Sequence, residues 1–129
     1  MKKVLLIGVT SIIMSSFSSL PITIASPCTP SISIMQVDSV QASMSTDTMT
    51  FKLNGLACPA GIVKVEVDGT FVGFYQNYDV AGSFVIENNG LTVPHATQHT
   101  LTVSLYENMG GWPVFAAHDS STVTTVPLP

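Results

Sequence analysis

The sequence contains no arginine and few charged residues of either sign. Two of its four lysines, Lys2 and Lys3, lie at the amino terminus, so only Lys52 and Lys64 remain for the rest of the chain, against eight acidic residues. Two lysines cannot form the basic surface that binds nucleic acid or anionic lipid. We therefore expect neither nucleic acid nor a membrane as a partner of the mature chain.

Signatures of catalysis are also missing. No G-x-S-x-G motif is present, and although His118-Asp119-Ser120 contains the residue types of a hydrolase triad, consecutive strand residues point to opposite faces. Glu66 and Asp68 are expected on an exposed hairpin tip, without the pocket that acid–base catalysis requires. We expect a chain that is not an enzyme and has no cofactor.

The chain contains imidazole and thioether side chains that could bind a metal ion. These are His95, His99, His118, Met35, Met44, Met49 and Met109. Copper favours imidazole and thioether ligands, but Cys58 lacks the closely following His and Met of a blue-copper site. We expect core methionines, surface histidines and no metal.

The chain has only two cysteines, Cys28 and Cys58. In an exported protein this pair predicts a disulfide, which would stabilise the fold by roughly 3–4 kcal/mol for a loop of this length. If the cysteines align two antiparallel strands, Ile32 should lie opposite Asn54 and Asp38 opposite Thr48.

The amino-terminal segment has the order of a secretory signal peptide. Two lysines precede an apolar run over 4–14, and small residues follow near Ala25. We therefore expect a signal peptide over 1–25, a single domain over 26–129, and a secreted, cell-surface or periplasmic location.

Alternating polar and apolar residues, with no helical periodicity, dominate the chain after residue 30. The pattern predicts short strands at 31–37, 48–54, 63–67, 70–75, 83–87, 91–93, 99–106, 114–117 and 121–126. Asp68-Gly69 and Asn89-Gly90 are typical of tight hairpin turns. The expected fold is an all-β, Ig-like antiparallel sandwich of seven to eight strands with one disulfide.

Two motifs within residues 61–106 carry a family resemblance. The hairpin sequence Val65-Glu66-Val67-Asp68-Gly69 and the later strand His99-Thr100-Leu101-Thr102-Val103 resemble prokaryotic Ig-like and fibronectin-type-III-like extracellular modules. Thr97 stands where that pattern has a glycine. The resemblance implies an adhesin, a filament subunit, a carbohydrate binder or a spacer.

Aromatic residues beside turns are the candidate binding residues. Tyr75, Tyr78 and Trp112 could form a platform on which sugar rings stack, with Trp112 in a loop between Gly111 and Pro113. Trp112 could instead fold back over one end of the core. Our first hypothesis is an exported non-catalytic surface, adhesive or structural module; the alternative is a carbohydrate or other small-ligand binder, and less favoured is a periplasmic copper binder.

The two terminal strands are the candidate sites of self-association. Residues 31–37 and 121–126 should form sheet edges, and neither segment carries a charge that would block pairing with another chain. Two states follow from this pattern: a monomer whose own termini cover these edges, or an oligomer or filament paired through them. A glycan or a surface protein is a further candidate partner.

Overall fold

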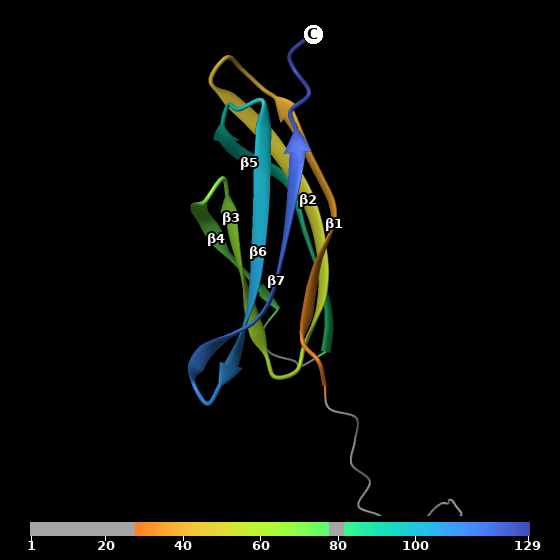
Figure 1. Cartoon of the computed structure of the whole chain (residues 1–129), viewed down its shortest axis with the longest axis vertical. Coiled ribbons are helices and arrows are strands. Elements are labelled where there is room, and N and C mark those ends of the chain that lie inside the picture. The colour runs from red at the N-terminus through yellow and green to blue at the C-terminus, as the bar shows by residue number, and fades with distance from the viewer. Residues whose placement is uncertain (1–27, 78–81) are drawn as a thin grey trace, which may run out of the picture.

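The computed structural model describes residues 28–77 and 82–129, which form seven strands and contain no helix (Figure 1). The expected signal peptide and Tyr78 lie outside the described residues. The strands are β1 (Ser31–Gln41), β2 (Thr46–Ala57), β3 (Gly61–Val67), β4 (Thr70–Asn77), β5 (Gly82–Pro94), β6 (Gln98–Met109) and β7 (Trp112–Thr124). The described ranges thus offer no helix that could cross a membrane.

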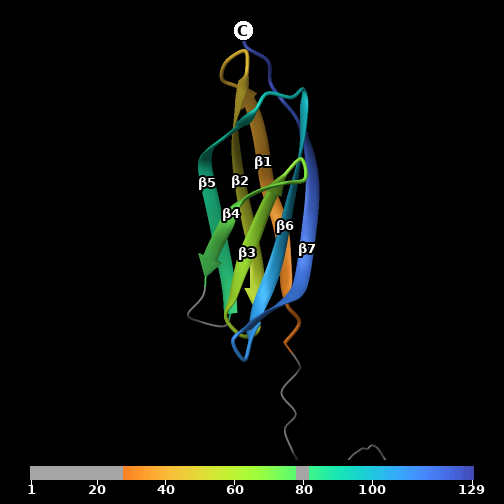
Figure 2. The same cartoon turned by 90° about the vertical axis from the view of Figure 1, so that its left-hand side faces the viewer.

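The strands form two antiparallel sheets, which confirms the expected all-β sandwich. One sheet has the order β1-β2-β5 and the other the order β4-β3-β6-β7. Figure 2 shows the strands of both sheets running along one long axis. The segment 114–117 and residues 121–124 of the expected last strand belong to the single strand β7, which ends at Thr124, whereas Val126 pairs with Val40 of β1.

Alternation in the two central strands of the larger sheet places the core. Val63, Val65 and Val67 of β3 are buried, as are three inward residues of β6. They pack against the inner face of the other sheet in one apolar cluster, which removes their side chains from water. The buried apolar residues are Ile32, Met49, Phe51, Leu53, Ala57, Val63, Val65, Val67, Phe84, Ile86, Val93, Leu101, Val103 and Leu105.

The first predicted hairpin is confirmed and the second is wrong. Asp68 and Gly69 both have positive φ, 54° and 80°, and join β3 to β4. Asn89 and Gly90 instead form a bulge within the continuous strand β5, opposite the register shift between Met49 and Phe51. The extra residue inverts the alternation, so that Ile86 before the bulge and Val93 after it both point into the core.

The expected register of the first two strands is also wrong. Ile32 lies opposite Gly55 and Asp38 opposite Thr50. The cysteines lie outside the ladder, which starts at Ser31 and Leu56, and a bulge between Ile34 and Gln36 shifts the pairing further. That bulge falls at Met35, where the polar–apolar alternation slips in the sequence.

Strands β1 and β7 are edge strands of their sheets, but they lie beside one another and are partly covered within the chain. The Ile34 amide donates to the Asp119 carboxylate at 2.8 Å. Further along β1, Val126 pairs in parallel with Val40, through backbone bonds to Ser39 and Gln41. Several of the polar backbone groups that an edge would offer to another chain are therefore satisfied internally.

Gly55 of β2 provides a test of the packing between β1 and β5. A Cβ atom at this position would lie 2.3 Å from the Ser31 carbonyl oxygen and 2.5 Å from the Phe84 ring. We expect Gly55→Ala to lower the free energy of unfolding by about 1–3 kcal/mol, measured by urea denaturation. Gly73→Ala is the matched control, because its Cβ would meet no atom within 4 Å. Equal stability of the two variants would contradict this account.

Candidate functional site

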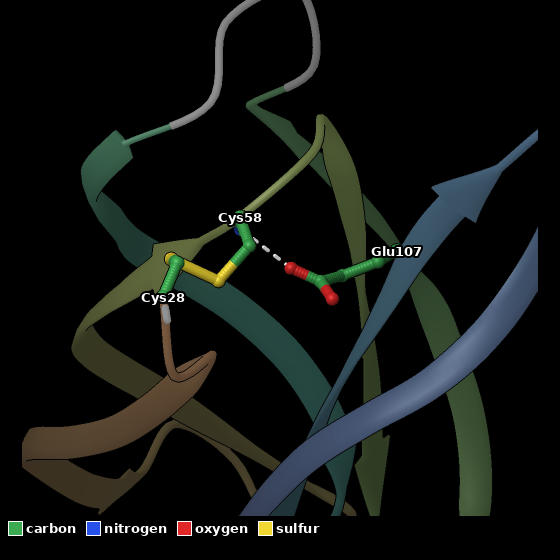
Figure 3. The surroundings of a disulfide bond; sticks show 3 residues. All are labelled: Cys28, Cys58 and Glu107. Atoms are coloured by element: carbon green, nitrogen blue, oxygen red, sulfur yellow. Dashed lines mark hydrogen bonds between the residues drawn. A yellow bond between two sulfur atoms is a disulfide. The ribbon is translucent and has the colours of Figure 1, made fainter. Parts of the chain in front are cut away.

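The predicted disulfide is present and closes one end of the sandwich (Figure 3). Cys28, just before β1, is bonded to Cys58, in the connection between β2 and β3. The buried Glu107 side chain of β6 accepts a hydrogen bond from the Cys58 amide, so the second sheet also contacts this bridge. The bond is consistent with an oxidising compartment.

The three predicted binding residues do not come together. Trp112 is 75% exposed at the start of β7, beside the Gly110-Gly111 turn, so it does not cover the core. Tyr75 packs inward against Phe51 at a ring-centroid distance of 5.7 Å, and its hydroxyl accepts a hydrogen bond from Asn88. Tyr78 lies outside the described residues. The predicted platform is therefore not formed by Tyr75 and Trp112.

A different set of aromatic side chains forms the candidate site on the outer face of the four-stranded sheet. Phe71 and Phe74 of β4 are half exposed, with their ring centroids 5.1 Å apart. On the other side of β3, Tyr106 of β6 contacts Phe115 of β7, with ring centroids 5.8 Å apart. We call this surface, with Ile62 between the two pairs, the aromatic face.

Strand alternation explains why these side chains point outward. Phe74 and Phe71 lie opposite Lys64 and Glu66, which alternate with the buried valines of β3. Tyr106 alternates with the buried residues of β6 and lies opposite Ile62. Because directly opposite residues in a sheet share a face, the registers of three strands bring these side chains together.

A groove of about 410 Å³ runs across the aromatic face, lined by Ile62, Lys64, Phe71, Phe74, Tyr106 and Pro113. A second hollow of about 240 Å³ shares three of these residues, Ile62, Tyr106 and Pro113. Lys64 is the one basic side chain that lines the groove. Its Nζ atom lies 3.3 Å from a carboxylate oxygen of Glu66, so the two charges balance. The groove is therefore lined by apolar and aromatic side chains and by Lys64, whose charge is paired with the neighbouring Glu66.

A polar network centred on the buried side chains of Asp47 and His99, the acid–imidazole clasp, joins the two sheets. We define it as Asp47 of β2, Asp68 of the β3–β4 turn, His95 of the connection between β5 and β6, and His99 of β6. The Asp47 carboxylate accepts hydrogen bonds from His99 Nε2 at 2.6 Å, His95 Nδ1 at 2.8 Å and the Ala96 amide at 2.9 Å. These bonds satisfy an acidic side chain that has no exposed surface.

His99 must carry a positive charge in this arrangement. Its Nδ1 lies 2.6 Å from Asp68, and its Nε2 lies equally close to Asp47. A neutral imidazole has only one N–H, so only the imidazolium can donate to both carboxylates. Burial opposes this charge, but the hydrogen bonds and charges of Asp47 and Asp68 outweigh burial and raise the pKa of His99 above 6.5.

The same contacts act in the opposite direction on Asp47. Burial alone would raise the pKa of this carboxyl group. The hydrogen bonds from Ala96, His99 and His95 outweigh burial and hold its pKa well below 3.8. Asp47 is thus the ionised partner of the His99 imidazolium.

Sequence reasoning missed both features, for different reasons. His99 was expected on the surface but is 1% exposed, and of the four methionines considered only Met49 is in the core. Asp68 lies on an exposed hairpin tip as expected, but its carboxylate is also bonded to His99. The outward orientation of Phe74 and Tyr106 could be predicted from the sequence, because neither residue falls in phase with the inward-facing residues of its strand.

The histidines do not gather with other ligands into a metal site. Within residues 28–77 and 82–129, no three His, Cys, Asp or Glu side chains form a group that could hold a metal ion. His95 and His99 instead both bond to Asp47, and His118 lies on the outer face beside Phe115.

No protein-family model, curated protein or solved structure matches the chain.

The clasp makes stability depend on pH with a defined sign. Because the pKa of His99 is raised on folding, its contribution is complete below about pH 6.5 and is lost as pH rises through the folded pKa. The lowered pKa of Asp47 contributes above about pH 3.8 and is lost in stronger acid. We expect the free energy of unfolding, measured by urea denaturation, to be highest between these values and to fall at higher pH.

Substitution of Asp68 tests whether the pH dependence of stability comes from the His99 imidazolium or from the net charge of the protein. Asp68→Asn removes one of the two carboxylates that stabilise the imidazolium, so the pKa of His99 should be raised less on folding. We therefore expect the variant to lose less stability between pH 6.5 and 9 than wild type loses. Asp38→Asn is the control, because Asp38 is exposed and, within the residues that the structure describes, its side chain bonds to Gln36 and not to a histidine. A wild-type stability that stays constant or rises over this range would contradict the charge assigned to His99.

Proposed function

We propose that this chain is an exported, non-catalytic β-sandwich that acts as a surface or adhesive module and attaches through the aromatic face. The observation that carries the proposal is the exposure of Phe71, Phe74 and Phe115 on one sheet. Large exposed apolar patches on small proteins are typical of interaction sites, because burying them in a complex removes them from water. Aromatic residues are enriched at the energetic centres of interfaces.

Three further features support this function. The Asp47 and Asp68 carboxylates both bond to His99, and none of these three side chains lines the groove. The disulfide suits an exported protein. Seven antiparallel strands in sheets of three and four also support the resemblance to Ig-like and fibronectin-type-III-like extracellular modules.

We do not extend the proposal to filament formation through 31–37 and 121–126. The Ile34 amide and the backbone near Ser39 are bonded to Asp119 and Val126, so these edges offer fewer groups to a second chain. The aromatic face has no such cover among the described residues.

Retention on a defined apolar surface tests the proposal. On an alkyl-terminated monolayer in a quartz-crystal microbalance, we expect the double variant Phe74→Ser/Phe115→Ser to be retained at least fivefold less than wild type. Both rings are about half exposed, so the variant should still fold, which circular dichroism checks. Val85→Ser is the control, because Val85 is 62% exposed on the other sheet. Equal retention of all three proteins would overturn the proposal.

A further inference from the structure

We infer that the groove on the aromatic face binds a neutral glycan chain. This inference rests on the proposed function and names the class of ligand for that surface. It is drawn from three properties of the groove: aromatic walls on two sides, a neutral polar pair between them, and a floor without free backbone groups.

The walls of the groove suit the apolar faces of sugar rings. Phe71 and Phe74 belong to β4 and Tyr106 to β6, and β3 lies between these strands with Ile62 in the floor. Strands two positions apart are separated by about 10 Å. The faces of aromatic rings carry partial negative charge, which attracts the weakly positive C–H groups on one side of a pyranose. A sugar ring above β3 would therefore contact aromatic carbon on both sides.

The polar pair supplies the hydrogen bonds that a glycan needs. Lys64 is a donor and Glu66 an acceptor, both are partly exposed, and sugar hydroxyls act in both roles. Ser104 lies opposite Lys64 and adds a hydroxyl on the same face. Because Lys64 and Glu66 neutralise each other, the groove offers no unpaired charge to an anionic or cationic ligand.

The floor of the groove argues against a peptide or an acyl chain. Both edges of β3 are paired, with β4 and with β6, so an extended peptide would find no free backbone groups there. An acyl chain would cover the Lys64–Glu66 pair and remove it from water without replacing its hydrogen bonds. The volume of about 410 Å³ lies within the range of roughly 300–1,000 Å³ that is usual for small-ligand sites.

Calorimetric titration of the purified exported chain tests this inference. The probes are neutral oligosaccharides of glucose, mannose and N-acetylglucosamine, with sulfated and sialylated oligosaccharides as the charged comparison. We expect saturable binding of at least one neutral probe and tighter binding of it than of any charged one. Amide chemical shifts should change at Ile62 and Tyr106 and not at Val85.

Variants of the walls and of the polar pair make the test specific. Phe74→Ala and the double variant Lys64→Met/Glu66→Met should each weaken binding at least tenfold. The double variant Lys64→Gln/Glu66→Gln keeps a donor and an acceptor without charge, and it should bind within threefold of wild type. Val85→Ala is the control on the other sheet and should bind as wild type does.

The outcomes separate this inference from the proposed function. If no probe binds, or a charged probe binds more tightly, while Phe74→Ser/Phe115→Ser still reduces retention on the alkyl surface, the glycan inference is wrong and the proposed function stands. If the double variant also leaves retention unchanged, both are wrong. Neutral-probe binding that Phe74→Ala leaves unchanged would place the glycan site elsewhere and overturn the inference.

Discussion

A charged imidazole held between two carboxylates is the interaction on which one end of this sandwich depends. His99 comes from β6, Asp68 from the β3–β4 turn, and Asp47 from β2 in the other sheet, so the three side chains tie both layers together. Loss of one partner of a buried ion pair usually costs about 3–5 kcal/mol, because the remaining charge stays buried. The clasp therefore makes the stability of the contact between the two sheets depend on the proton that His99 carries.

The clasp also orders the carboxy-terminal segment. The Thr125 hydroxyl donates to the Ala96 carbonyl at 2.7 Å and lies 2.9 Å from the Ser39 hydroxyl. Ala96 in turn donates to Asp47. The segment after β7 is thereby placed against β1, where Val126 forms its parallel bridge. One buried charge thus supports a contact between the first strand and the last residues of the chain.

The sequence predicts the rows of side chains within single strands better than the contacts between strands. The buried valines of β3 and the disulfide follow from alternation and cysteine content. The bulge at Asn89 does not, because a tight-turn pair such as Asn89-Gly90 can also occupy a bulge within one strand. The slip at Met35 is visible in the alternation, but its effect on strand pairing is not. The β1–β2 register was wrong because the cysteines lie outside the ladder and the bulge at Met35 shifts the pairing further.

The candidate site shows the same limit more strongly. Phe74 and Tyr106 could be recognised as outward-facing, yet the groove between them exists only because β3 separates β4 from β6. Strand order of this kind is set by the whole fold, and no local pattern encodes it. The clasp likewise joins Asp47 and His99, which are 52 residues apart, so each looked like an ordinary polar residue.

The placement of the two chain ends has a mechanical consequence. The start of β1, shortly after Cys28, and the carboxy-terminal residues lie at opposite ends of the long axis (Figure 1), and Val126 runs parallel to Val40 of β1. Interstrand hydrogen bonds lie across the strand direction, so a pull along this axis loads the Val126 contacts in shear, together rather than one after another. Force entering at Cys28 also passes through the disulfide to Cys58, which spreads the load beyond the first strand.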